Sequence, residues 1–105
     1  MMNDNSVHVD DDGTVRLSGE LTFESTPSIY RELEGRFQST GDVISVDLAK
    51  IDQTDSAGLA LLLEWQAMAN RQNRTLHIQN APDILLTLAK LAEADKLLNL
   101  SPRND

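Results

Sequence analysis

The sequence contains no cysteine and few aromatic residues. Without cysteine there are no disulfides, no thiolate metal ligands and no cysteine nucleophile. Aromatic residues make up only 4% of the chain, so we expect an aliphatic core. Hydrophobic residues (40%) and charged residues (25%) occur at the frequencies of an ordinary soluble globular protein. The length of 105 residues then predicts a single domain over residues 1–105.

Positive charge is also scarce. The chain has nine Lys and Arg residues and 17 Asp and Glu residues, which gives a formal net charge of −8. Because nucleic acids and anionic lipid surfaces are negative themselves, we expect the protein to bind neither directly. Residues 1–55 carry twelve acidic and four basic residues, whereas residues 56–105 carry five of each. The neutral second half is therefore where we expect a surface for a partner.

Long hydrophobic runs are missing. The longest apolar run, from Ala57 to Leu63, is far shorter than the roughly 20 residues that span a bilayer. Residues 1–13 have neither the basic nor the apolar region of a signal peptide. We therefore expect a cytoplasmic protein that does not insert into a membrane.

Hydrophobic periodicity predicts strands that alternate with helices. Apolar residues alternate with polar ones over 7–9 and 15–18, around an Asp-Gly turn, which predicts a β-hairpin. Thr26 is the expected N-cap and Pro27 the first residue of an amphipathic helix that ends near Thr40-Gly41. Its apolar positions are Ile29, Leu33 and Phe37.

The rest of the chain repeats this alternation. Its expected elements are a buried strand (43–48), a loop (49–55), a helix (56–71) followed by a left-handed Asn73, a strand (75–78), a helix opened by Ala81-Pro82, and a short strand or docked tail (97–100). This order predicts an α/β fold. We expect a mixed sheet, with an N-terminal hairpin followed by parallel strands, covered by about three to four helices.

Helical wheels predict which faces are buried. In the helix over 56–71, the predicted core stripe is Leu61, Leu62, Trp65, Met68 and Ala69. Leu59 and Leu63 lie beside that stripe, and the pattern allows either a partner surface or packing under a neighbouring helix. In the third helix we expect the core-facing residues to be Ile84, Leu88 and Leu91. The outward residues are expected to be Leu86, Thr87 and Lys90.

The segment Asp55-Ser56-Ala57-Gly58 opens the second helix. Either Asp55 or Ser56 can cap the unpaired N–H groups of the first turn. Ser56 also lies at the positive end of the helix dipole, where an added phosphate would be stabilised. Two interpretations stay open, a simple helix cap and a regulatory or contact serine.

Catalytic and metal-binding patterns are absent from the sequence. His8 and His77 are the only histidines, and they belong to no triad and no metal-spaced set. The acidic run Asp10–Asp12 lacks the other ligands of a calcium loop and indicates a solvated turn. There is no phosphate-binding glycine loop. We therefore expect no catalytic residue, no metal, no cofactor and no enzymatic activity.

Three segments carry a family resemblance. The stretches Leu17–Thr22 (LSGELT) and Val46–Leu63 (VDLAKIDQTDSAGLALLL) resemble the STAS domain family. With Thr87–Leu91 (TLAKL) they are similar to the STAS subunits of the Mla phospholipid-transport ABC systems of Gram-negative bacteria. The resemblance extends from about Val15 to Leu98. At Ser56 those subunits usually have threonine, so this chain keeps the hydroxyl.

The resemblance implies a function. It implies a STAS fold and a non-catalytic subunit of an intermembrane phospholipid transport complex that maintains outer-membrane lipid asymmetry. Such a subunit binds the cytoplasmic ABC ATPase subunit, stabilises or activates it, and is peripheral to the inner membrane. The implied contact residues are Asp55, Ser56, Ala57, Gly58, Leu59, Leu63, Leu86, Thr87 and Lys90. The alternative is an anti-sigma factor antagonist that an anti-sigma factor serine kinase switches by phosphorylating Ser56.

Overall fold

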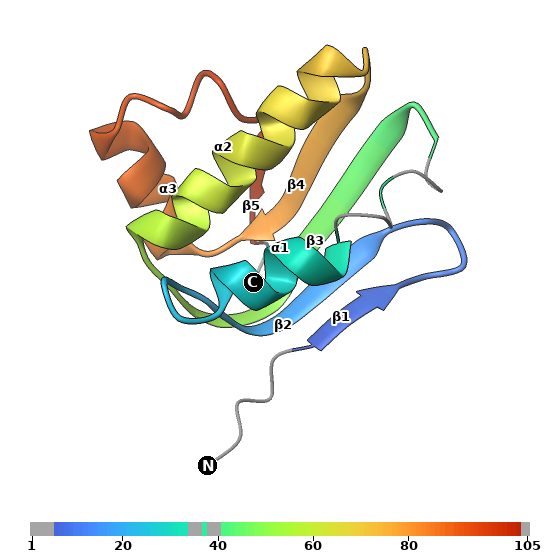
Figure 1. Cartoon of the computed structure of the whole chain (residues 1–105). Helices are drawn as coiled ribbons and strands as arrows, with labels where there is room; N and C mark the ends of the chain where they lie inside the picture. Colours follow the sequence, from blue (N-terminus) through green and yellow to red (C-terminus); the bar gives the residue numbers. More distant parts are fainter. Residues whose placement is uncertain (1–5, 34–36, 38–40, 104–105) are drawn as a thin grey trace.

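A five-stranded sheet and three helices make up the described part of the chain, which in this computed structural model is residues 6–33, 37 and 41–103 (Figure 1). The strands lie in the sheet in chain order, with β1 antiparallel to β2 and every later neighbour parallel. The predicted mixed sheet with an N-terminal hairpin is confirmed. The elements are β1 (Ser6–Val9), β2 (Val15–Leu21), α1 (Thr26–Leu33), β3 (Val43–Thr54), α2 (Ser56–Arg71), β4 (Thr75–Ala81), α3 (Asp83–Leu91) and β5 (Leu100–Pro102).

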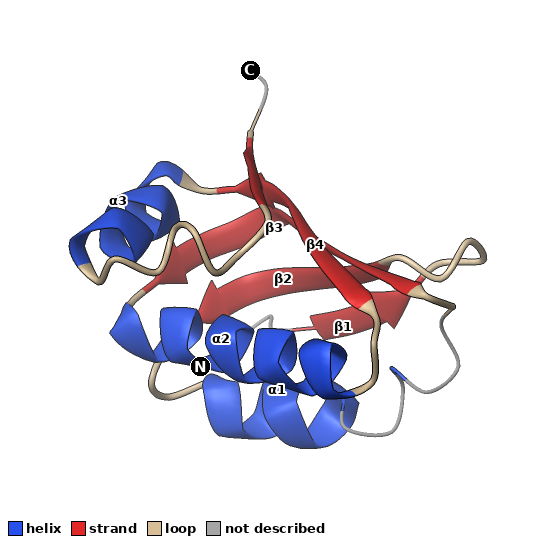
Figure 2. Ribbon diagram, turned by 90° about the horizontal axis from the view of Figure 1, so that it is seen from above, coloured by secondary structure: helices blue, strands red, loops and turns tan. Residues whose placement is uncertain are grey.

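The three helices cover one face of the sheet. Each helix connects two neighbouring parallel strands, and right-handed crossovers that all advance in one direction place their helices on the same side. Figure 2 shows α1 and α2 running along that face. The central helix, α2, contacts both α1 and α3. None of the described helices is long and apolar enough to cross a membrane.

The core between helices and sheet is aliphatic, as the composition predicts. Leu61, Leu62, Trp65 and Ala69 are buried and Met68 is half-buried, which confirms the predicted core stripe of α2. The Trp65 ring packs edge-on against Phe37, with ring centroids 5.2 Å apart and planes at 78°. This geometry is one that aromatic pairs prefer.

Strand β3 is twice as long as predicted. It continues through the predicted loop 49–55 as far as Thr54, paired with β2. The register between the two strands shifts twice, and Gly19 in β2 has φ +96°. Bulges of this kind break the alternation of inward and outward side chains. As a result Asp47 and Leu48 are both buried while Ala49 and Lys50 are both exposed, so periodicity did not reveal the strand.

Two helix ends follow the prediction closely. Helix α2 spans the predicted residues, and Asn73 beyond it adopts φ +56°. Helix α1 begins at Thr26 itself, one residue before Pro27, and the main-chain oxygen of Ser25 accepts the first helical hydrogen bond, from Ile29 N at 3.1 Å. Thr26 is therefore not the N-cap. Ile29, Leu33 and Phe37 are buried as predicted, whereas the predicted end near Thr40 lies outside the described residues.

The final strand and the third helix differ from the prediction. The segment after α3 forms a strand, but this strand, β5, begins at Leu100. In α3 the core-facing residues are Leu85 and Ala89, while Ile84 is 49% and Leu91 77% exposed. The predicted stripe is therefore wrong at Ile84 and Leu91, whereas Leu88 is partly buried against the core. Because α3 is apolar around most of its circumference, the sequence pattern does not determine which side faces the core.

Gly58 is placed where no side chain fits. A Cβ atom built on Gly58 would lie 2.3 Å from the main-chain oxygen of Leu21 and 2.4 Å from Oγ1 of Thr54. Thr54 Oγ1 donates a hydrogen bond of 2.8 Å to that same oxygen. The first turn of α2 therefore packs directly against the ends of β2 and β3.

Substituting Gly58 by alanine should destabilise the fold. The added methyl group meets a main-chain oxygen and a hydrogen-bonded hydroxyl, neither of which can move freely. Gly58→Ala should therefore lower the free energy of unfolding by about 1–3 kcal/mol. Urea unfolding measures this. Gly41→Ala is the matched control, because a Cβ there meets nothing within 4 Å. Equal stabilities of the two variants would contradict the close packing.

Candidate functional site

The junctions between parallel strands and helices gather at one edge of the sheet. Because β2, β3 and β4 run parallel, their carboxyl ends meet at the same edge, where open α/β sheets commonly bind ligands. Short connections lead from there into α1, α2 and α3, namely residues 22–25, Asp55 and Pro82. In Figure 1 the start of α2 lies between α3 and the loop that precedes α1. This edge contains Ser56.

The carboxylate of Asp55 organises this edge. Its Oδ1 accepts hydrogen bonds from the main-chain N–H of Ala57 at 2.9 Å and of Gly58 at 3.3 Å. Its Oδ2 accepts one from the main-chain N–H of Phe23 at 3.1 Å. Asp55 is therefore the N-cap of α2 and also holds the β2–α1 loop against it. Of the two cap residues that the sequence allowed, the structure selects Asp55.

Ser56 is the first residue of α2, and it is exposed. Since Asp55 caps the helix, the Ser56 hydroxyl is not the capping group. The hydroxyl lies at the positive end of the α2 dipole, where an acceptor or a negative group would be stabilised. The position suits a contact made with another molecule.

The other predicted contact residues divide by burial. Thr87 and Lys90 are exposed; Asp55, Ala57, Leu63 and Leu86 are half-buried. Gly58 is buried, and Leu59 is only 5% exposed and belongs to the core. Of the two alternatives that the sequence left open for Leu59, the structure shows packing inside the protein. Leu63 packs partly against the same core.

A hydrogen-bond and ion-pair network around Asp47 was not predicted from the sequence. This buried carboxylate accepts hydrogen bonds from Asn80 Nδ2 at 3.0 Å and from the main-chain N–H of Ala49 at 2.8 Å. It also pairs with Arg16, which bridges to Asp10 at 2.5 Å. Burial opposes ionisation of Asp47, but the Asn80 and Ala49 hydrogen bonds and the Arg16 charge together hold its pKa below the ordinary value.

Arg103, which follows β5, binds main-chain groups in the same region. Its guanidinium donates to the main-chain oxygens of Asn80 at 3.0 Å, Leu48 at 2.6 Å and Ile51 at 2.7 Å. Leu48 lies at the first shift of register between β3 and β2, between Asp47 and Lys50, and Ile51 directly precedes the second. Arg103 therefore satisfies carbonyl groups around the bulge. Nothing in its sequence neighbourhood indicated this role.

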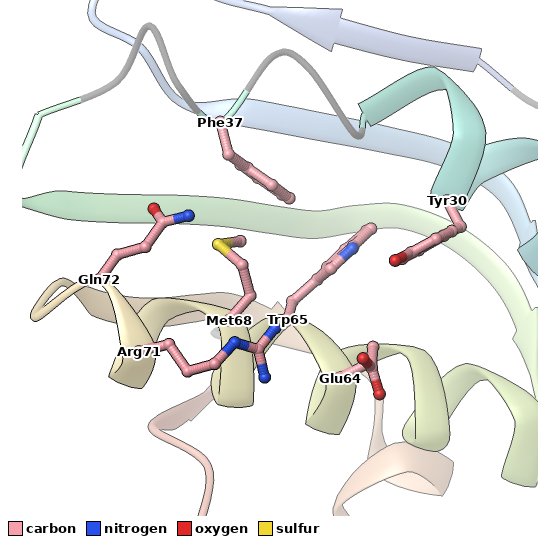
Figure 3. Close-up of a pocket in the computed structure, with 7 residues that line it drawn as sticks. All are labelled: Tyr30, Phe37, Glu64, Trp65, Met68, Arg71 and Gln72. Atoms are coloured by element: carbon pink, nitrogen blue, oxygen red, sulfur yellow. The ribbon is translucent and has the colours of Figure 1, made fainter.

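A small cavity lies between α2 and Phe37. Figure 3 shows the side chains of Tyr30, Phe37, Trp65 and Met68 converging on it, with Glu64 on α2 below Tyr30. Its volume is about 80 Å³. It is separate from Ser56, and no residue predicted for the site lines it.

The histidines make structural contacts. His77 Nε2 lies 2.8 Å from Ser101 Oγ, and His8 Nε2 lies 3.2 Å from Asp10 Oδ1. Within the described ranges no cluster of three or more His, Cys, Asp or Glu side chains is arranged to hold a metal ion. The arrangement around Ser56 is thus one exposed hydroxyl beside a carboxylate whose two oxygens accept main-chain N–H groups.

Comparison with known proteins identifies relatives. The family model described as "Mlab, STAS domain" matches residues 6–99. The intermembrane phospholipid transport system binding protein MlaB of Escherichia coli is 33% identical over 78 residues, which are 74% of this chain and 77% of that protein. Two solved structures share the fold. One is the unphosphorylated anti-sigma factor antagonist SpoIIAA, with a TM-score of 0.69 and 17% identity over 92% of this chain and 87% of that one. The other is an anti-sigma factor antagonist from Mycobacterium paratuberculosis, with a TM-score of 0.72 and 18% identity over 96% of this chain and 86% of that one.

Removing the N-cap carboxylate should destabilise α2, whereas removing the neighbouring hydroxyl should not. We expect Asp55→Ala to lower the free energy of unfolding by about 0.5–2 kcal/mol, because two N–H groups of the first turn and that of Phe23 lose their acceptor. Ser56→Ala is the matched control and should unfold like the parent protein. Thermal or urea unfolding measures both. A larger loss for Ser56→Ala than for Asp55→Ala would show that the cap is misassigned.

The lowered pKa of Asp47 predicts a pH-dependent contribution to stability. The contribution is complete above the pKa of about 3.9 of an unfolded aspartate and is lost as the pH falls through the lower folded value. At pH 7, Asp47→Asn should reduce the free energy of unfolding by about 1–3 kcal/mol, and the difference should shrink below about pH 4. Urea unfolding between pH 7 and pH 3 tests this. Asp52→Asn, at an exposed position of β3, should show little effect at any pH.

Proposed function

The chain belongs to the STAS domain family, in its MlaB branch, and on that premise we propose that it is a non-catalytic subunit of an ABC-type intermembrane phospholipid transport complex. In this role it binds the cytoplasmic ATPase subunit and stabilises or activates it. The observation that carries the proposal is the identity with MlaB over three quarters of the chain. Binding to that subunit would make the protein cytoplasmic and peripheral to the inner membrane.

The geometry supports a contact made through α2 and α3. Seven outward or half-outward residues on the two neighbouring helices form what we call the docking face, and only Lys90 among them is charged. Apart from Lys90, its side chains are apolar or small, a composition typical of the centre of a protein interface. An exposed stripe of this kind on α3 is unusual for a surface that faces only solvent. The docking face comprises Ser56, Ala60, Leu63, Ile84, Thr87, Lys90 and Leu91.

The surroundings of Ser56 support a role without catalysis. A nucleophilic serine needs a base within hydrogen-bond reach. The adjacent carboxylate, Asp55, already accepts three main-chain hydrogen bonds with its two oxygens, so it is committed to the fold. We therefore assign Ser56 a hydrogen bond to the ATPase subunit.

The second candidate is an anti-sigma factor antagonist switched by phosphorylation of Ser56. The observation that favours it is the exposed serine at the first position of α2, following Asp55, in a fold shared with two such antagonists. A phosphate there would meet the positive end of the helix dipole. Co-purification separates the two functions, because a bound ABC ATPase supports the first and a bound serine kinase supports the second.

A negative charge at position 56 should weaken binding to the ATPase subunit. Ser56→Asp places an unpaired charge in a neutral contact that excludes water, so we expect at least about a tenfold loss of affinity, and a smaller loss for Ser56→Ala. Lys90→Glu should behave like Ser56→Asp. Titration calorimetry with the ATPase subunit of the same transporter measures the affinities.

The control adds the same charge elsewhere on α2. Asn70→Asp lies near the other end of the helix, outside the docking face, and should bind normally. Thermal unfolding should leave Ser56→Asp as stable as the parent protein. If Ser56→Asp binds like Asn70→Asp, the contact lies elsewhere on the molecule.

A further inference from the structure

We propose that Phe23 is the aromatic anchor of the contact with the ATPase subunit, entering an apolar pocket whose rim carries Lys or Arg side chains. The inference rests on the proposed function and extends the docking face to the opposite flank of Ser56. No sequence pattern pointed to Phe23, because it lies in a connecting loop outside the predicted helices and strands.

Phe23 is strongly exposed although its backbone is fixed. Its residue surface is 76% exposed, which is unusual for a large aromatic side chain. The turn that carries it is closed by hydrogen bonds from Thr22 N to Ser25 Oγ at 2.9 Å and from Thr26 N to Thr22 O at 2.8 Å. Phe23 N is itself bound to Asp55. A side chain presented on a fixed turn loses little freedom on binding, and aromatic anchors of this kind dominate interface energies.

The Phe23 loop leads directly into a groove between α1 and α2. Thr26 and Ala57 line this groove and lie three and two residues from the Phe23–Asp55 link. The groove is open and measures about 390 Å³. Its lining continues into the aromatic cavity of Figure 3 through Tyr30 and Glu64, which border both hollows. The complete lining is Thr26, Pro27, Tyr30, Ala57, Ala60, Leu61 and Glu64.

The charges around this apolar surface indicate the chemistry of the partner. Glu24 follows Phe23 in the loop, Asp55 binds its N–H, and Glu64 lies in the groove. The residues that line the groove itself include neither Lys nor Arg, and one basic residue, Arg71, lines the adjoining cavity. Opposite charges across an interface favour association, whereas like charges oppose it. A second copy of this chain would bring the same carboxylates and a net charge of −8. A different protein, with basic residues around an apolar pocket, is the matching partner.

The test measures the affinity of three variants for the ATPase subunit. Phe23→Ala should bind at least about tenfold more weakly while its melting temperature stays unchanged, because the side chain is exposed in the free protein. Glu64→Lys should also bind more weakly, and its affinity should depend less on salt concentration than that of the parent protein. Val43→Ala is the control, 58% exposed at the amino end of β3, and should bind normally.

The outcomes separate this inference from the function on which it rests. If the parent protein does not bind the ATPase subunit at all, the proposed function fails. If the parent protein binds and Phe23→Ala binds as tightly as Val43→Ala, the function stands and the anchor is refuted. If Phe23→Ala instead abolishes self-association while ATPase binding is unchanged, a second copy occupies this surface and the inference is again refuted.

Discussion

The carboxylate of Asp55 is the interaction on which the candidate site depends. One side chain accepts main-chain hydrogen bonds from the first turn of α2 and from the β2–α1 loop, two segments more than thirty residues apart in sequence. It fixes where α2 begins and where Phe23 is presented. Because Asp55 performs the capping, the next residue, Ser56, needs no structural partner within the chain. A helix start capped by its own serine would have turned that hydroxyl toward the backbone.

Gly58 supports the same arrangement by steric means. The absence of a side chain lets α2 begin directly over the ends of β2 and β3, where Thr54 and Leu21 are already hydrogen-bonded. Gly58 and Leu59 are thus buried, whereas Ser56, Thr87 and Lys90, which the sequence grouped with them, are exposed. A motif read along the chain mixes these two classes, because neighbouring residues of a helix point in different directions.

The sequence indicated much of the fold because most elements carry a local signal. Helix α2 has an acidic cap, a wide apolar stripe and a left-handed Asn73 beyond its end, and its bounds followed from these features alone. The second half of β3 has no such signal, because two bulges against β2 disturb its alternation. In α3 the buried residues are Leu85 and Ala89, and the side that faces the core could not be predicted because leucines occur on several sides of the helix. Long-range partners such as Asp47 with Asn80, or Arg103 with Leu48, depend on contacts that periodicity does not contain.

The exposed apolar residues on and after α3 have a consequence for the behaviour of the protein in solution. Ile84 and Leu91 in α3, and Leu97 beyond its end, are exposed apolar side chains that favour precipitation of the protein at high concentration. The excess of carboxylates opposes this aggregation, because strongly acidic molecules repel one another and stay in solution. The protein therefore resists aggregation best at low ionic strength and at a pH well above its isoelectric point of about 4.5. The solubility of the protein therefore depends on salt concentration and pH as well as on the stability of its fold.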